Sequence, residues 1–210
     1  MTDVKPGARR RKAEATRRKI LHAAHEEFLR SGFHGATMTA IAKRAGVAVQ
    51  TVYFVFHTKP ELISAVIDAA VLGDEPTPPE ETDWWKAMEA EADPATALRI
   101  FVRGAAPLFA RATPISEVLR AAALADEEVR RTHEHHEEMR YAAYRRIVEM
   151  LARKGRLPDG LDIDSATDVF FTIFGDAVYF QLTAERGWNQ QRVVDWLCAI
   201  LPTLLLDSDD

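Results

Sequence analysis

The stretch that decides how the first part of the chain folds is TMTAIAKRAGVAVQTVYFVFHTKPEL, residues 37–62. In it, Ala42, Gly46 and Val52 stand at relative positions 0, +4 and +10. A small residue lets two helices cross closely, a glycine permits the turn between them, and an apolar residue anchors the second helix to the core. This spacing predicts a helix-turn-helix with helices over 38–45 and 49–55, which leaves one face of the second helix open.

Capping residues mark where the neighbouring helices begin and end. Thr37 is placed to accept a hydrogen bond from the first turn of the helix that follows it. Thr58 and Glu61 form the T-x-x-E pattern of a capping box, which predicts a fourth helix beginning at Thr58. A first helix over about 11–31 is indicated by Gly32 after its end and by one apolar face, formed by Ile20, Leu21, Ala24 and Phe28.

The remainder of the chain is also predicted to be helical. A proline-rich, acidic stretch at 73–83 predicts a linker, and Pro107 and Pro114 predict helix boundaries. The helices predicted after the linker are 84–91, 94–110, 115–126, 128–154, 164–186 and 189–206. No segment alternates apolar and polar residues between hairpin turns, so the predicted fold is all-α. Residues 1–60 are assigned to a three-helix helix-turn-helix domain with a basic N-terminal extension, and 61–210 to a second helical domain.

Charge is distributed unevenly along the chain. Residues 1–59 carry 12 basic and 4 acidic residues, a balance of +8, whereas the rest carries 15 basic and 28 acidic residues, a balance of −13. We therefore expect only the first part to meet a polyanion, although a solvated basic tail would produce the same pattern. A single cysteine, Cys198, excludes an intrachain disulfide, and no apolar run reaches the roughly 20 residues of a membrane span. The chain is expected to be cytoplasmic and not membrane-bound.

The segment 37–62 resembles the DNA-binding region of TetR-family regulators. The residues that match the family pattern in register are Thr37, Ile41, Ala42, Ala45, Gly46, Val47, Tyr53, Phe56, Lys59 and Leu62. The helix before them also matches, so that the specific resemblance covers about residues 15–65. It implies a homodimeric transcriptional repressor, in which two helix-turn-helix units bind a near-palindromic double-stranded DNA operator one helical turn apart.

The resemblance also implies which side chains contact DNA. These DNA-binding residues are Thr37, Thr39, Gln50, Thr51, Tyr53, Phe54, Lys59, Arg10 and Arg11. Gln50 and Thr51 are expected to read bases, and Thr37, Tyr53 and Lys59 to contact phosphates. Arg10 and Arg11 belong to the basic extension, which resembles the arms that other proteins lay along phosphates or in a minor groove.

Several alternatives remain open at these positions. Tyr53 packed under the helix pair, Thr37 acting only as a cap, and a solvated Gln50 are all compatible with the sequence. The chain also departs from the family pattern twice. Ala48 stands where a capping serine is usual, which costs on the order of 1 kcal/mol. Gln50 stands where glycine is usual. Because a glutamine side chain can hydrogen-bond adenine, this departure predicts an operator sequence that differs from those of other family members.

For residues 61–210 the resemblance implies a ligand site and a dimer interface. Two apolar segments, 164–186 and 189–206, are too apolar to be exposed, and the resemblance predicts that these two C-terminal helices pair with those of a second copy; closure of the monomer core is the alternative. The predicted ligand is a small apolar or amphipathic molecule, with no cofactor. The predicted ligand-binding residues are Phe101, Phe109, Met139, Tyr144, Phe174 and Asp176, although plain core packing would explain the aromatic ones equally well.

Three rival functions are weighed against the regulator. His133, His135 and His136 lie close enough in THEHHEE to suggest a zinc or nickel site, but the charged residues around them favour a solvated helix, so no metal site is predicted. An enzyme is disfavoured because the chain lacks phosphate-binding glycine loops and nucleophile motifs. A sequence-neutral architectural DNA-binding protein would bind all duplexes with similar affinity.

Overall fold

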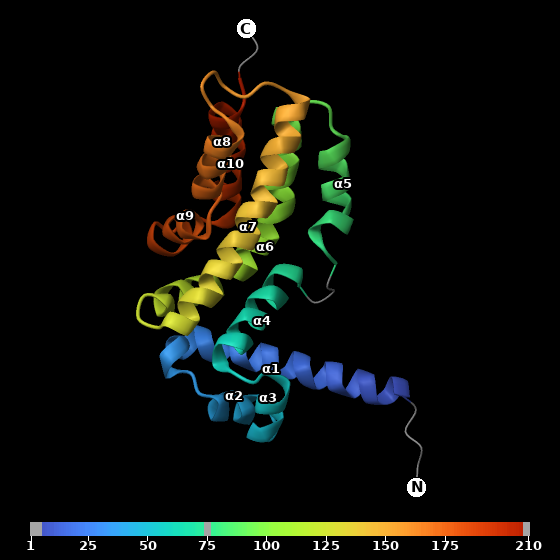
Figure 1. Ribbon diagram of the computed structural model, residues 1–210, viewed down its shortest axis with the longest axis vertical. Helices are drawn as coiled ribbons and strands as arrows, with labels where there is room; N and C mark the ends of the chain where they lie inside the picture. Colours follow the sequence, from blue (N-terminus) through green and yellow to red (C-terminus); the bar gives the residue numbers. More distant parts are fainter. Residues whose placement is uncertain (1–5, 74–76, 208–210) are drawn as a thin grey trace. The chain divides into compact units, whose positions relative to one another are not determined.

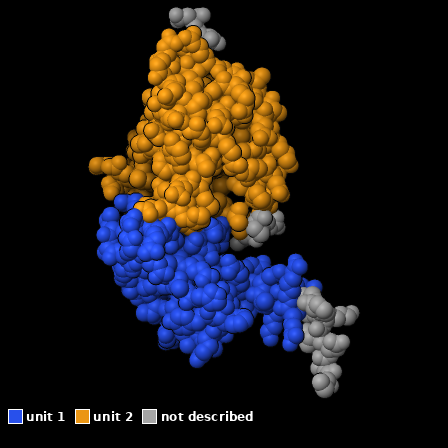
Figure 2. Space-filling model, viewed as in Figure 1, with its two compact units in different colours: residues 1–69, 118–132 blue, residues 70–117, 133–210 orange. Residues whose placement is uncertain are grey.

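The computed structural model describes residues 6–73 and 77–207, with the backbone alone described for 6–8. Two compact units are formed, unit 1 from 1–69 and 118–132 and unit 2 from 70–117 and 133–210 (Figure 2). Within the described residues there are helices and connecting loops but no strands, which confirms the all-α prediction (Figure 1). The helices are α1 (Pro6–Gly35), α2 (Met38–Ala45), α3 (Val49–Val55), α4 (Lys59–Leu72), the 3-10 turn η1 (Pro79–Glu81), α5 (Asp83–Ala90), α6 (Pro94–Ala123), α7 (Glu127–Lys154), α8 (Ile163–Ile173), α9 (Asp176–Phe180), the π-helical turn η2 (Gln181–Glu185) and α10 (Gln190–Leu205).

The predicted caps of the helix pair are present. The Ala40 amide donates to Thr37 Oγ1 at 3.1 Å, and Gly46 ends α2 in the left-handed conformation with φ +67°. Ala48 provides no side-chain cap to α3, because its methyl group has no hydrogen-bond acceptor. The capping box of α4 is altered: the Glu61 amide donates to Thr58, but the Glu61 carboxylate accepts from the amide of His57. Glu61 thereby ties the exit of α3 to the start of α4.

The first helix is longer than predicted at both ends. Gly32 has φ +67°, as expected of a residue after a helix end, yet one further helical turn follows it as far as Gly35. At the other end α1 begins at Pro6. A proline is tolerated there because the N–H groups of the first turn have no acceptor within the helix, so no hydrogen bond is lost. Residues 9–12 of the predicted basic extension are therefore part of a regular helix.

Pro107 and Pro114 do not end a helix, which corrects the prediction of separate helices at 94–110 and 115–126. Both prolines lie inside the 30-residue helix α6. An interior proline costs about 3 kcal/mol because a backbone hydrogen bond is lost. α6 buries Leu98, Val102, Ile115 and Leu119 almost completely, and burying each such side chain stabilises the fold by about 1.5–3 kcal/mol. These four side chains together contribute about 6–12 kcal/mol, which offsets the roughly 6 kcal/mol that the two prolines cost.

The predicted single helix 164–186 is interrupted, which is a second correction. α8 ends at Ile173, Phe174 and Gly175 leave the helical conformation, and the short α9 and the π turn η2 follow. The Tyr144 hydroxyl donates to the carbonyl of Phe174 at 3.0 Å, which satisfies the carbonyl at the helix end. A Cβ at Gly175 would lie 2.8 Å from the Phe171 carbonyl oxygen, so this position accepts no side chain without a shift of the backbone.

Each unit has its own apolar core. In unit 1 the helices α1 to α4 bury one another's apolar faces, and the large residues that they bury completely include Ile20, Phe28, Ile41, Val52, Phe56, Leu62 and Ile63. In unit 2 the core is rich in aromatic rings, which come from α5, α6, α7 and α8. α8 and α10 pack side by side there (Figure 1). None of the helices described is both long and apolar enough to cross a membrane.

Candidate DNA-binding surface and ligand pocket

The short helix α3 has one buried face and one exposed face. Val52 is 0% exposed and anchors the helix to the core of unit 1. Successive residues of a helix are turned by about 100°, so Gln50 and Phe54 lie opposite Val52 and Tyr53 lies on the flank beside them. All three are exposed, Tyr53 to 51% and Phe54 to 84%. The structure therefore presents an amide, a phenol and a phenyl ring together, and the core packing left open for Tyr53 is not what this geometry shows.

Two threonines lie at the start of α2, the helix that precedes α3. Thr37 and Thr39 are exposed, and Thr51 near the start of α3 is half-buried. The Thr37 oxygen accepts a hydrogen bond from Ala40, which leaves the hydroxyl hydrogen to be donated outward. A hydroxyl beside the first amides of a helix is an arrangement that favours an anion. Capping and a phosphate contact are thus compatible roles for Thr37.

Lys59 is placed differently from the other predicted contacts. Its ammonium donates to the carbonyl of Phe33 at 2.7 Å and of Ala36 at 3.0 Å, and it lies 4.4 Å from the centre of the Phe33 ring. Burial lowers the pKa of Lys59, while the charge of Asp126 opposes this shift. Lys59 thus satisfies carbonyls at the end of α1, and one N–H remains for a phosphate.

The basic residues at the start of α1 are exposed. Arg10 pairs with Glu14 one turn further on, with 3.0 Å between Arg10 Nε and Glu14 Oε1, and Arg11 is exposed as well. The helix fixes their spacing, so an extended arm inside a minor groove is not the conformation of these residues here. They present a positive edge that is suited to phosphates.

A buried carboxylate that the sequence did not single out joins α1 to α2. Glu27 is 3% exposed and lies 2.7 Å from Arg30 and 3.2 Å from Arg44, which also pairs with Glu26 at 3.0 Å. Hydrogen bonds from Arg30 lower the pKa of Glu27, with Arg44 adding to the effect against the cost of burial. Because an arginine 17 residues away supplies the second contact, no local sequence pattern indicates this pair.

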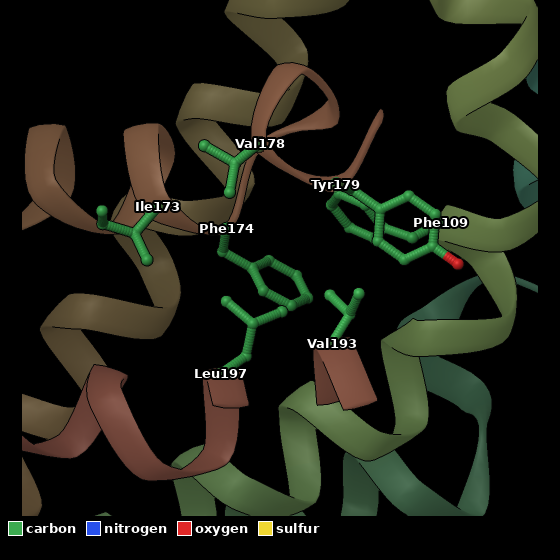
Figure 3. A pocket seen from close by; sticks show the side chains of 8 residues that line it. Phe109, Ile173, Phe174, Val178, Tyr179, Val193 and Leu197 are labelled. Carbon is green, nitrogen blue, oxygen red and sulfur yellow. The ribbon is translucent and has the colours of Figure 1, made fainter. Parts of the chain in front are cut away.

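Unit 2 contains a small apolar pocket at the break between α8 and α9. Its empty volume is about 180 Å³, including solvent at the mouth. Figure 3 shows Phe174 in the middle of the group, with Val193 and Leu197 directed toward it from α10 and the rings of Phe109 and Tyr179 lying against each other. The lining residues are Phe109, Ile173, Phe174, Gly175, Val178, Tyr179, Val193 and Leu197. The walls are therefore almost wholly apolar.

The structure brings together four of the six predicted ligand-binding residues. Phe109 and Phe174 line the pocket, with 4.5 Å between their ring centres. Phe101 and Tyr144 are buried behind Phe174, at 5.3 and 5.7 Å from its ring. Burial raises the pKa of Tyr144, which keeps its hydroxyl protonated as a donor to the Phe174 carbonyl. Met139 on α7 is 46% exposed and does not line this pocket.

Asp176, the sixth predicted residue, stands directly after the pocket residue Gly175. Its carboxylate accepts a hydrogen bond from Thr113 of α6 at 2.8 Å and lies 3.4 Å from Nη1 of Arg140 on α7. Arg140 also pairs with Glu137 at 2.7 Å and stacks on the Phe171 ring at 4.2 Å. The Nε and Nη1 atoms of Arg140 are buried without a hydrogen bond in the described structure. A polar group thus lies next to an apolar pocket.

The histidines of α7 do not assemble a metal site in the structure. The rings of His135 and His136 are 6.0 Å apart at an angle of 64°. No group of three or more His, Cys, Asp or Glu side chains within 6–73 and 77–207 is arranged to hold a metal ion. Cys198 is buried on α10, and burial raises the pKa of its thiol.

The fold and the exposed face of α3 define a helix-turn-helix protein with a second, all-helical unit. Residues 20–66 match the sequence profile of the family described as "Bacterial regulatory proteins, tetR family". This match confirms the predicted resemblance of the helix-turn-helix region to TetR-family regulators.

Individual relatives agree with this assignment. The HTH-type transcriptional regulator UidR of Escherichia coli K12 is 46% identical over 55 residues, which are 26% of this chain and 28% of UidR. The HTH-type transcriptional repressor BepR of Brucella suis is 28% identical over 189 residues, covering 86% of this chain and 88% of BepR. The transcriptional regulator FadR from Bacillus subtilis, solved in complex with stearoyl-CoA, shares the fold with a TM-score of 0.70 and 18% identity, covering 89% of this chain and 97% of FadR. All three are named as regulators or repressors.

Proposed function

We propose that the protein is a sequence-specific transcriptional regulator, acting as a repressor that a small molecule releases from its operator. The observation that carries this proposal is the exposed face of α3, where Gln50, Tyr53 and Phe54 project from a helix whose opposite side is fixed in the core. A rigid helix with polar and apolar groups on its free side is what reading the major groove requires. Gln50 and Thr51 are proposed to read bases, and Thr37, Thr39, Tyr53, Lys59, Arg10 and Arg11 to contact the backbone.

A homodimer formed through the two C-terminal helices is part of the proposal. α8 and α10 retain apolar side chains that are only partly covered, namely Val169, Phe171, Ile173, Trp196, Ile200 and Leu204. Covering them with the same helices of a second copy would remove this surface from water. A dimer would also place two recognition helices on successive turns of DNA, about 34 Å apart, and a near-palindromic operator follows from that symmetry. A cytoplasmic location belongs to the same proposal.

The ligand is proposed to enter the pocket beside Phe174. Ligand sites usually enclose about 300–1,000 Å³. The space enclosed here is about 10 Å³, room for about one water molecule, so the pocket would have to widen as the ligand binds. Phe109 and Phe174 would contact the apolar part, and Asp176 with Arg140 would meet a polar head. FadR, which shares this fold, was solved with stearoyl-CoA, an amphipathic molecule. Release follows if the ligand favours a state with lower operator affinity, a coupling of typically 1–3 kcal/mol.

Selection of random DNA duplexes by the purified protein tests the DNA-binding part. We expect enrichment of one near-palindrome, binding that weakens steeply with salt, and a loss of affinity of at least tenfold for Gln50→Ala or Tyr53→Ala. Leu124→Ala, which removes an equally exposed apolar side chain elsewhere in unit 1, is the matched control and should bind normally. Uniform binding to all duplexes would indicate an architectural protein instead, and no binding would refute the proposal.

Release from the selected operator tests the ligand part. Labelled operator bound to the protein is titrated with stearoyl-CoA and with short-chain and long-chain carboxylates and amines, and release is followed by fluorescence anisotropy. An active compound should lose potency with Phe109→Ala and with Asp176→Asn, whereas Asp83→Asn, at the exposed start of α5 and outside the proposed dimer helices, serves as the control. Equal potency on all variants would place the ligand elsewhere.

A further inference from the structure

Phe54 is the most exposed large apolar side chain in the described part of the chain, at 84%. It lies on α3 opposite Val52, and the core beneath the helix is already closed by Val52 and Phe56 at 0% and 1% exposure. Phenylalanine is also a weaker helix former than alanine, leucine or glutamate. Neither the packing of unit 1 nor the stability of α3 therefore accounts for a phenyl ring at this position, and the ring is available to a partner.

The chemistry of the ring limits what it can recognise. A phenyl group has no hydroxyl or amide, so it cannot hydrogen-bond a phosphate or the edge of a base. It gains free energy by displacing water from another apolar group. In the major groove the apolar group that the bases present is the methyl on C5 of thymine, and phenylalanine is among the side chains that contact it. 5-Methylcytosine carries the same methyl at the same ring position.

The neighbour of Phe54 on the helix indicates where this methyl would lie. Gln50 is one turn earlier, and residues four apart on a helix have their Cβ atoms about 5–6 Å from each other. Base pairs are stacked about 3.4 Å apart, so the two side chains reach the same base pair or pairs one or two steps away. Glutamine pairs with adenine, whose partner is thymine. A glutamine and a phenyl ring at this spacing suit a run of A·T pairs.

We propose that Phe54 is a specificity-determining residue that reads a pyrimidine 5-methyl group in each half-site, within two base pairs of the adenine contacted by Gln50. This inference rests on the proposed function and adds to it the chemical group that is read. It makes the operator sensitive to a single methyl group at one symmetric position. It also means that methylation of a cytosine at that position would strengthen binding rather than block it.

The test replaces each thymine of the selected operator, one symmetric pair at a time, with 2′-deoxyuridine. This change removes only the methyl and keeps base pairing, and binding is measured by fluorescence anisotropy at fixed salt. Burying one methyl group strengthens binding about fourfold. At one position we therefore expect binding to weaken about fourfold per half-site, and about 15-fold when both half-sites carry the change. At the same position, 5-methylcytosine opposite guanine should bind better than cytosine opposite guanine by a similar factor.

Phe54→Ala decides whether the ring is responsible. The variant should bind the thymine operator more weakly and should no longer distinguish thymine from deoxyuridine, so that the two changes are not additive. Phe54→Leu, which keeps an apolar side chain, should retain part of the discrimination, and Leu124→Ala should retain all of it. Circular dichroism checks that the variants are folded.

Two results would overturn the inference. If the wild-type protein binds thymine and deoxyuridine operators equally at every position, no methyl group is read. If discrimination exists but persists in Phe54→Ala, another residue reads the methyl. The proposed function would survive both results, because it fails only if the wild-type protein selects no operator at all.

Discussion

Unit 1 and unit 2 place their aromatic side chains in opposite ways. On α3 of unit 1, Tyr53 and Phe54 are 51% and 84% exposed, whereas Phe101 and Phe174 in unit 2 are 5% and 3% exposed. α3 is seven residues long and buries one side only. Phe174 is in contact with rings from both α6 and α7 as well as with Phe170 of α8. Residue type therefore does not indicate the role of an aromatic side chain; the number of helices packed around it does.

The glycines at the two helix junctions differ in the same way. Gly46 between α2 and α3 has φ +67°, and a Cβ there would meet nothing within 4 Å. Gly175 between α8 and α9 has an ordinary φ of −115°, but a Cβ there would collide with the Phe171 carbonyl. The first is required by backbone conformation, which is a local property. The second is required by close approach, which depends on how the chain has turned.

Phe174→Ala should have the largest effect on stability. Removing a buried ring leaves a cavity among Phe101, Phe109 and Tyr144, and we expect a loss of about 3–5 kcal/mol in the free energy of unfolding of unit 2. Urea denaturation followed by tryptophan fluorescence measures it, since all four tryptophans, Trp84, Trp85, Trp188 and Trp196, lie in unit 2. A loss below about 1 kcal/mol would mean that the core is not closed around this ring.

Gly175→Ala is expected to be the next most damaging change. The new methyl would lie 2.8 Å from a backbone carbonyl, and overpacking of this kind costs about 1–3 kcal/mol. Gly46→Ala is the matched substitution and should cost about 1–2 kcal/mol through its left-handed conformation alone. The first loss should appear in tryptophan fluorescence and the second in circular dichroism. A Gly175→Ala protein that is more stable and more helical would show that glycine alone causes the break.

Glu27→Gln tests the buried ion pair of unit 1 and its pH dependence. We expect a loss of about 2 kcal/mol at pH 7, since charged hydrogen bonds to Arg30 and Arg44 are weakened. The folded-state pKa of Glu27 is lowered, so its stabilisation is complete above the ordinary value of 4.5 and is lost as the pH falls toward the folded-state value. The difference in unfolding free energy between the wild-type protein and Glu27→Gln should therefore shrink as the pH falls. Thermal unfolding by circular dichroism from pH 7 to pH 3 measures it, and a constant difference would contradict the assignment.

Phe54→Ala should have the smallest effect on stability. Its ring is exposed, so removal should change the free energy of unfolding by less than about 0.5 kcal/mol in either spectroscopic signal. Phe54→Ala and Phe174→Ala are the same substitution at an exposed and at a buried position, so the difference between their unfolding free energies measures the effect of burial. A loss above about 1 kcal/mol would show that the ring packs within the folded protein, and the comparison between the two units would then fail.

Local interactions explain what the sequence alone determined. The two helices around Gly46, the Thr37 cap and the absence of a side-chain cap at Ala48 follow from contacts between residues no more than four positions apart, and such contacts are visible in a sequence. The sequence also predicts the exposed face of α3, because an apolar Val52 among polar neighbours marks the side of the helix that packs inward. The family resemblance rests on these same residues.

Only the tertiary structure decided the remaining features. Pro107 and Pro114 predict helix ends, but α6 continues through both, because the burial of its apolar side chains offsets what the prolines cost. At the break before Gly175 the Tyr144 hydroxyl donates to the Phe174 carbonyl across 30 residues of sequence, and Thr113 donates to Asp176 across 63 residues. The ion pair between Glu27 and Arg44 and the carbonyl contacts of Lys59 are equally non-local. Interactions between distant segments have no period or spacing in the sequence, since folding itself brings the partners together.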